Sequence, residues 1–130
     1  MVSTSKPYSV LITDDDRGCR EALREIMEPE GFHTRLASSG EEALDIVRDE
    51  PIHLAFLDMN MPTLSGLETL ELVRQFNVLL PVVLVTADRT EALMRQALRA
   101  HAYSVIAKPV SKHIVLYTVV RALSRAYGEP

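Results

Sequence analysis

The sequence of 130 residues has one cysteine, no excess of basic residues and no long apolar run. Cys19 alone can form no internal disulfide and no metal site of paired cysteines. Its place on the apolar face of an expected helix predicts a small core residue. The net charge of −4 disfavours a surface for nucleic acid, which needs clustered Lys and Arg. No stretch approaches the roughly 18 apolar residues that cross a membrane, and the polar start has no signal-peptide core. We therefore expect a cytoplasmic protein that contacts neither nucleic acid nor membrane directly.

Short apolar runs alternate with amphipathic stretches along the whole chain. The runs predict five strands, at 8–13, 32–37, 54–57, 82–85 and 104–107, and helical spacing predicts five helices, at 17–28, about 41–48, 65–76, 89–100 and 112–127. Residues 1–7 form an expected disordered leader before one domain at 8–127. Five successive strand–helix units predict an α/β doubly wound three-layer sandwich with a parallel sheet in the flavodoxin-like order 2-1-3-4-5.

The stretch 53–62 carries the strongest local signal. Its apolar run ends abruptly at Asp58, and Asn60-Met61-Pro62 follow as a turn. A wholly apolar strand is covered on both faces, as in a parallel sheet between helices. The carboxyl ends of such strands are where open α/β sheets place their sites. Asp58 is therefore the first candidate for function.

Polar side chains also follow the other expected strands. The residues at the strand ends are Asp14 and Asp15, then Asp58 and Asn60, then Thr86 and Asp88, and finally Lys108. In a parallel sheet these ends share one edge, so the side chains should converge on a shallow pocket. Carboxylates that lie together raise one another's pKa unless a cation compensates them. Mg²⁺ suits such a site because it prefers oxygen ligands.

A pocket of this composition can also accept a phosphoryl group. Carboxylates form aspartyl-phosphates, so Asp58 could act as the nucleophile. Catalysis of phosphoryl transfer rests mainly on positioning and on neutralising charge. Mg²⁺ and Lys108 would supply the positive charge, and Thr86 would donate a hydrogen bond to a phosphoryl oxygen.

As a set, these motifs resemble the receiver domain of two-component response regulators (CheY-like), over almost the whole chain. The residues that carry the resemblance are Thr13-Asp14-Asp15-Asp16, Leu57-Asp58-Met59-Asn60-Met61-Pro62, Val85-Thr86-Ala87 and Lys108-Pro109. It implies a signalling switch, rather than an enzyme acting on a separate substrate, which takes a phosphoryl group from a sensor histidine kinase or histidine phosphotransfer protein.

The resemblance also assigns roles to individual residues. Asp58 would be the phosphoacceptor, and Asp14, Asp15 and the backbone carbonyl of Asn60 would help it bind Mg²⁺, with Mn²⁺ as an alternative. The remaining assignments are Thr86, Ala87 and Lys108 as phosphate-binding or switch residues, Asn60 and Asp88 as variable flanking positions, and Pro109 as a cis-proline.

Three features depart from the family pattern. Val105 occupies the position of the aromatic switch residue, and Tyr103 would share its face if the strand keeps its register, so we expect a muted or differently routed switch. His101 replaces a usual glycine and predicts strain at a helix C-cap. The apolar last helix predicts a dimer or output interface on helix four, strand five and helix five.

Other functions remain open at this level. A haloacid-dehalogenase-like phosphatase also uses an aspartate and Mg²⁺, but its nucleophile lies on the first strand as Asp-x-Asp, and the chain has no room for its cap. A nucleotide-binding flavodoxin-like module would need a glycine-rich loop after the first strand, which the sequence does not have. A pseudo-receiver scaffold, which accepts no phosphate, conflicts with the complete set of acidic residues and Lys108.

Overall fold

The computed structural model describes residues 7–128, so the expected leader at 1–7 lies almost wholly outside the described residues. The elements are, in order, β1 (Ser9–Thr13), α1 (Arg17–Met27), the 3₁₀ turn η1 (Glu28–Glu30), β2 (His33–Ala37), α2 (Gly40–Asp49), β3 (Leu54–Asp58), α3 (Gly66–Val73), β4 (Val82–Thr86), α4 (Glu91–Arg99), β5 (Ser104–Ala107) and α5 (Lys112–Tyr127). Within the described residues, no helix combines the length and the apolar character needed to cross a bilayer.

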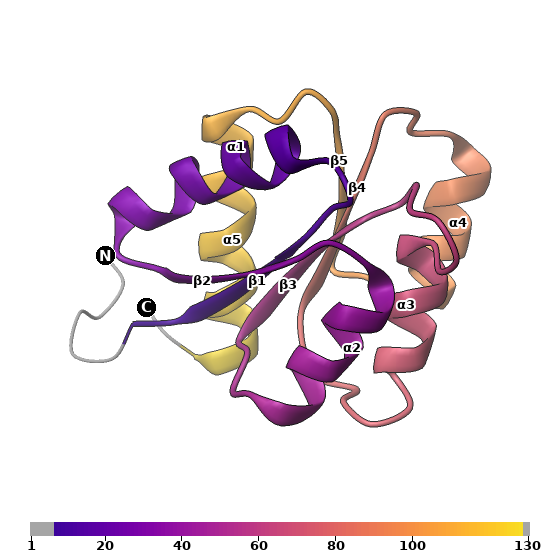
Figure 1. The fold of residues 1–130 in the computed structure, drawn as a ribbon, viewed down its shortest axis with the longest axis horizontal. Helices are drawn as coiled ribbons and strands as arrows, with labels where there is room; N and C mark the ends of the chain where they lie inside the picture. Colours follow the sequence, from indigo (N-terminus) through magenta and orange to yellow (C-terminus); the bar gives the residue numbers. More distant parts are fainter. Residues whose placement is uncertain (1–6, 129–130) are drawn as a thin grey trace.

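The five strands form one parallel sheet in the order β2-β1-β3-β4-β5, as predicted. Figure 1 shows the three layers, with α1 and α5 on one face of the sheet and α2, α3 and α4 on the other. Each face has its own apolar core, since side chains along a strand alternate between faces. Every residue of β3 and β4 is buried, whereas the edge strand β2 is partly exposed.

Side-chain caps fix where the helices begin. Asp16, Ser39, Ser65, Thr90 and Ser111 each accept a hydrogen bond from a backbone N–H in the first turn of the helix that follows. The Ser65 cap is reciprocal, because Glu68 accepts in turn from the Ser65 backbone N–H. These caps set the length of each loop after a strand, and these loops surround the carboxyl edge of the sheet.

Three predictions differ from the structure. The third helix ends at Val73 rather than 76, because Gln75 and Phe76 continue with tighter i→i−3 bonds. Cys19 is half-buried rather than a core residue, since it lies in the first turns of α1 at the rim of the site. Tyr103 does not share a face with Val105: it packs with the α1–α5 core, and Val105 belongs to the core under α2–α4. Tyr103 lies in the bend before β5, so strand alternation does not reach it.

Candidate functional site

Two buried carboxylates and one ammonium group meet at the carboxyl edge of the sheet. Asp14 follows β1 directly and Asp58 ends β3, and both are almost inaccessible to solvent. The Nζ atom of Lys108, just after β5, lies 2.8 Å from Asp58 Oδ1 and 3.1 Å from Asp14 Oδ2. Parallel pairing therefore brings together three residues that are far apart in the sequence, as predicted.

Asp15 completes a group of acids that fits a divalent cation. One carboxylate oxygen each from Asp14, Asp15 and Asp58 lies within 4.8 Å of the others. The oxygen donors are of the kind that Mg²⁺ prefers. Lys108 supplies one positive charge against the three negative charges of the carboxylates. Two further positive charges, as on a divalent cation, would balance the group. The residues present therefore fit the predicted cofactor. Asn60 is exposed two residues beyond Asp58, and the role of its carbonyl stays a prediction.

The electrostatics of the group have identifiable causes. Burial raises the pKa of the Asp58 carboxyl; the hydrogen bond from Lys108 opposes this, while the charge of Asp14 adds to it. Burial lowers the pKa of Lys108, but its hydrogen bonds to Asp58 and Asp14 outweigh burial and raise that pKa overall. Lys108 is therefore charged at neutral pH, and Asp58 is a carboxylate whose negative charge the site disfavours without a further cation.

The loop after β1 is held by contacts that the sequence does not reveal. Arg20 Nη1 donates to the Asp14 carbonyl oxygen at 2.7 Å, and the Asp16 N–H donates to Asp14 Oδ1 at 2.9 Å. Asp16 itself caps α1 by accepting from the Cys19 N–H at 2.9 Å. Of the three consecutive acids, Asp14 and Asp15 thus face the site and Asp16 is structural. Arg20 orients Asp14, and its six-residue separation from Asp14 belongs to no motif that would have predicted this.

The Thr86 hydroxyl is the predicted group that the structure does not bring to Asp58. Thr86 ends β4 and is buried, but its Oγ1 accepts from the Asp88 N–H at 3.1 Å and donates to the Asp88 carbonyl oxygen at 3.4 Å in a local turn. Ala87 and Asp88 are exposed beside it. The Lys108 N–H donates to the Thr86 carbonyl oxygen at 2.8 Å, so the tips of β4 and β5 are held in register. To donate to a phosphoryl oxygen, the Thr86 hydroxyl would have to release the Asp88 carbonyl oxygen.

The expected cis bond is present between Lys108 and Pro109. An apolar hollow of about 440 Å³ lies beside it, lined in part by Cys19, Ala22, Pro109 and Val110. Burial raises the pKa of the Cys19 thiol, so this side chain contributes bulk rather than a thiolate.

Gly66 is a second residue whose importance the sequence does not show. A Cβ added there would lie 2.4 Å from the carbonyl oxygen of Asp58. The first residue of α3 therefore lies directly against the backbone that carries the candidate phosphoacceptor. Any larger side chain would press on the end of β3.

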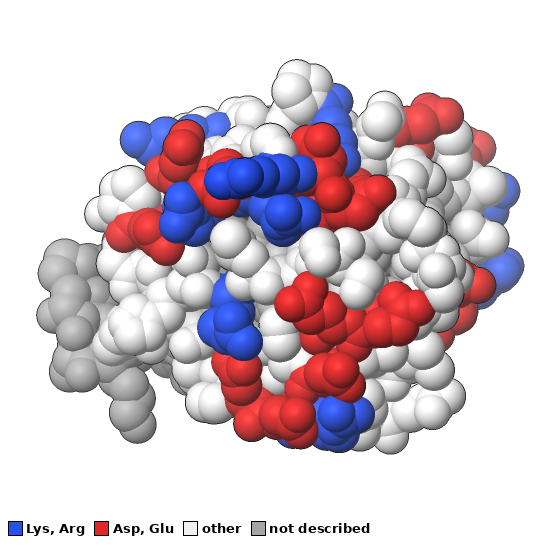
Figure 2. All heavy atoms as spheres, viewed as in Figure 1, with Lys and Arg blue, Asp and Glu red and all other residues white. Residues whose placement is uncertain are grey.

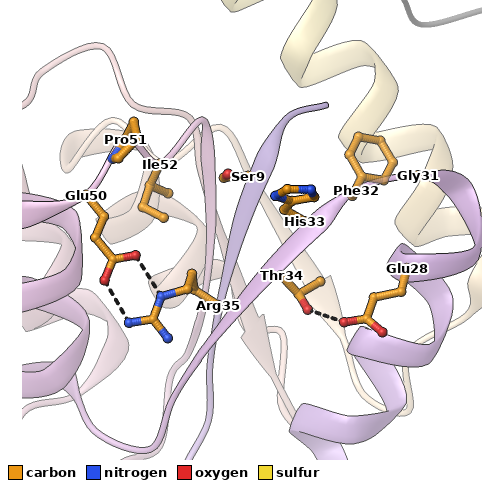
Figure 3. Close-up of a pocket in the computed structure, with 10 residues that line it drawn as sticks. All are labelled: Ser9, Glu28, Gly31, Phe32, His33, Thr34, Arg35, Glu50, Pro51 and Ile52. Atoms are coloured by element: carbon orange, nitrogen blue, oxygen red, sulfur yellow. Dashed lines mark hydrogen bonds and ion pairs between the residues drawn. The ribbon is translucent and has the colours of Figure 1, made fainter. Parts of the chain in front are cut away.

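A hollow of about 670 Å³ around the edge strand β2 is not part of this site (Figure 3). It includes Ser9 and His33, which begin their strands and so lie at the opposite edge of the sheet. Its polar groups satisfy one another: Arg35 pairs with both Glu50 oxygens at 2.7 Å, and the Thr34 hydroxyl donates to Glu28 at 2.6 Å. We therefore place the functional site at the carboxyl edge.

Comparison with known proteins identifies the family. The family model described as "Response regulator receiver domain" matches residues 10–120. The chain is 34% identical over 119 residues to the response regulator RR06 of Streptococcus pneumoniae, covering 92% of this chain and 54% of that protein. It is 34% identical over 118 residues to the transcriptional regulatory protein CpxR of Escherichia coli, covering 91% and 50%. The chain thus spans about half the length of these curated relatives.

Solved structures give the same result. A CheY-like response regulator receiver domain protein from Methanospirillum hungatei superposes with a TM-score of 0.90 at 26% identity, covering 95% of this chain and 98% of that one. The receiver domain of NtrX from Brucella abortus superposes with a TM-score of 0.83 at 30% identity, covering 88% and 98%. The chain therefore belongs to the response regulator receiver domains, the signalling switches of two-component systems.

Proposed function

We propose that Asp58 accepts a phosphoryl group from a phosphohistidine on a sensor histidine kinase or a histidine phosphotransfer protein. A carboxylate oxygen of Asp58 attacks phosphorus, the phosphorus–nitrogen bond breaks, and its electron pair leaves with the imidazole, which takes up a proton. The observation that carries the proposal is the bridge from Lys108 to both buried carboxylates, because it places a fixed positive charge where phosphoryl oxygens would arrive.

Asp14, Asp15, Asp58 and the backbone carbonyl of Asn60 would hold the divalent cation, Mg²⁺ or Mn²⁺. When bound, the cation supplies neutralising charge to the phosphoryl oxygens. The Asp58 side chain must then turn one carboxylate oxygen toward the phosphorus of the donor, and the Lys108 ammonium moves to contact the negatively charged phosphoryl oxygens. Arg20 keeps Asp14 in place through the carbonyl contact at 2.7 Å.

The switch would begin at Thr86. Its hydroxyl gives up its hydrogen bond to the Asp88 carbonyl oxygen and donates to a phosphoryl oxygen instead, so the loop from Ala87 onward moves toward the site. Val105 is buried among apolar side chains at the aromatic switch position, and Tyr103 lies on the other face of the sheet. We therefore expect the signal to pass through the β4–α4 loop rather than through an aromatic rotamer. Phosphorylation would shift the balance between two states of this loop.

The test is phosphorylation with acetyl phosphate and Mg²⁺, followed by mass spectrometry of the intact protein. We expect one added phosphoryl group on the wild type and none on Asp58→Ala. The analogue beryllofluoride should change the spectra of residues in the β4–α4 loop in the wild type alone. No modification of a folded wild type would favour a scaffold that accepts no phosphate, and sustained hydrolysis of a phosphomonoester would favour a phosphatase.

A further inference from the structure

A cluster of three aromatic rings lies at the amino edge of the sheet, at the opposite end of the strands from Asp58. Tyr8 precedes β1, His53 precedes β3 and Tyr127 ends α5, so three distant segments of the chain meet there. The Tyr8 and Tyr127 rings are stacked with their centroids 5.6 Å apart. The His53 ring is nearly perpendicular to both, at 5.1 Å from Tyr8 and 5.5 Å from Tyr127. The last turn of α5 is thus packed against the beginnings of two strands.

His53 also makes the hydrogen bonds that join these segments. The Ser9 N–H donates to Nδ1 of the imidazole at 2.9 Å, and the His53 N–H donates to the Ser9 carbonyl oxygen at 2.9 Å. The Tyr127 hydroxyl donates to the His53 carbonyl oxygen at 2.7 Å. His53 is therefore bound to β1 through its ring and its backbone, and α5 is bound to His53.

The hydrogen bond from Ser9 requires a neutral imidazole. A ring nitrogen that accepts a hydrogen bond carries no proton, whereas the imidazolium has an N–H at both nitrogens. A proton on Nδ1 would point at the Ser9 N–H, so two donors would face each other and the ring would have to turn away. An unperturbed histidine gains its proton at about pH 6.5, which lies within the physiological range.

The charged groups around the cluster leave this effect of protonation in place. Glu50, at the end of α2, binds Arg35 through both carboxylate oxygens at 2.7 Å. The other acidic side chains of α2 and α3, which Figure 2 shows gathered on one face, are exposed, so water and salt screen their effect on His53. Burial raises the pKa of the Tyr127 hydroxyl, and the nearby Tyr8 adds to this rise, so Tyr127 keeps its proton at neutral pH. Two further titratable groups on the adjoining elements, His33 at the start of β2 and Arg125 in the last turn of α5, are exposed.

We propose that Tyr8, His53 and Tyr127 form a pH-sensitive latch, which fastens the last turn of α5 to the sheet while the imidazole is neutral and releases it when the imidazole gains a proton. When the His53 ring turns away, Tyr127 loses one of its two ring contacts. The hydrogen bond from its hydroxyl to the His53 carbonyl oxygen is then open to competition from water. The latch does not depend on the phosphorylation proposed for Asp58.

A cation–π attraction acts in the opposite direction. A charged imidazole beside two tyrosine rings is attracted by their faces, which favours the protonated form. At a half-buried position such as that of His53, this gain is smaller than the loss of a hydrogen bond that leaves two donors facing each other. We therefore expect the latch to be complete above the ordinary pKa of histidine and to open as the pH falls below it.

A pH titration of the wild-type chain, without a phosphodonor, tests the latch. The nitrogen NMR shift of His53 Nδ1 should show an unprotonated nitrogen at about pH 8 and a protonated one at about pH 5.5. The chain has no tryptophan, so its near-ultraviolet circular dichroism comes mainly from its four tyrosines. The signal of the stacked pair should fall over the same pH range, while the far-ultraviolet signal stays constant. Hydrogen exchange of the Ser9 amide, corrected for the intrinsic rate, should become about tenfold faster.

Variants assign the response to His53. His53→Asn places an amide oxygen near the position of Nδ1, so it can accept from the Ser9 N–H but does not titrate in this range. Its near-ultraviolet signal should be the same in acid as at neutral pH. The matched control His33→Asn removes an exposed histidine from the start of the neighbouring strand and should keep the wild-type response. Tyr127→Phe lacks the hydroxyl that binds the His53 carbonyl oxygen, so its stacked-pair signal should be weaker at every pH.

Several outcomes would overturn the latch. It fails if the near-ultraviolet signal of the wild type does not change with pH or grows in acid, or if His53→Asn responds as the wild type does. It fails if Nδ1 of His53 already carries the proton at about pH 8. It also fails if the far-ultraviolet signal is lost over the same pH range, because the change would then be general unfolding in acid. Loss of the response in His33→Asn would assign the proton to the other histidine.

Discussion

Replacing Gly66 by alanine should disturb the backbone that carries Asp58, the proposed phosphoacceptor. The new Cβ would lie 2.4 Å from the Asp58 carbonyl oxygen, 2.9 Å from its carbonyl carbon and 3.0 Å from Met59 Cα. These atoms are backbone and cannot rotate away. The Met59 N–H is bonded to the Val85 carbonyl oxygen at 2.8 Å, so β4 holds this end of β3 in place. To restore a contact of 3.0–3.4 Å, α3 and β3 must separate by about 0.6–1.0 Å.

The cost of this separation can be estimated. Forcing one extra methyl into a well-packed core destabilises by about 1–3 kcal/mol. Unfolding of a chain of this length has an entropy of about 0.27 kcal/mol/K, so the melting temperature should fall by about 4–11 °C. Alanine favours helix over glycine by at most about 1 kcal/mol, and the gain is smaller at the first helical position. The steric effect should therefore dominate.

Thermal unfolding and the rate of phosphorylation by acetyl phosphate both measure the effect. We expect Gly66→Ala to melt earlier and to react more slowly, since Asp58 is carried by the displaced backbone. Gly18→Ala on α1 is the control for unfolding. Its Cβ would meet only the Asp16 side chain, at 3.2 Å, so stability should be equal or slightly higher. If Gly66→Ala were as stable as Gly18→Ala and reacted at the wild-type rate, the close approach of α3 to β3 would be wrong.

Three further predictions concern the site and one helix end. Mg²⁺ at about a hundred times its dissociation constant should stabilise the wild type by about 2.7 kcal/mol and raise its melting temperature by about 10 °C. Asp15→Asn should lose most of this increase in melting temperature. An equal increase in both proteins would contradict the cation site. Burial raises the pKa of the Asp58 carboxyl in the folded protein. The contribution of Asp58 to the free energy of unfolding is therefore most favourable at pH values below its pKa in the unfolded chain. It is lost as the pH rises through its pKa in the folded protein. In the absence of metal, Asp58→Asn should therefore have a higher urea midpoint of unfolding than the wild type at neutral pH, and the difference between the two midpoints should disappear in acid. A difference that does not change with pH would refute the burial argument. His101, directly after the C-cap residue Ala100 of α4, has a φ of 63°, so His101→Gly should raise the unfolding free energy by about 0.5–1 kcal/mol, whereas a loss of stability would show that the imidazole makes a compensating contact.

The sequence was sufficient for the fold and for grouping Asp14, Asp15, Asp58 and Lys108 at one edge of the sheet. Fully apolar runs such as Leu54–Leu57 predicted strands buried on both faces, and residues such as Ser65 and Ser111 marked where helices begin. These signals are local, because the alternation of a strand and the turn of a helix are properties of the backbone. Once the strands are parallel, their carboxyl ends share an edge, so Asp14, Asp58 and Lys108 could be grouped before any contact was known.

Contacts between elements were decided only by the tertiary structure. Tyr103 turned to the opposite face from Val105 because the chain leaves the cap of α4 in a bend. The Thr86 hydroxyl was found in its own turn, Arg20 was found on the Asp14 carbonyl, and Gly66 was found against Asp58. Each of these depends on the position of a neighbouring loop or helix to within about an ångström, which residue type and spacing do not encode.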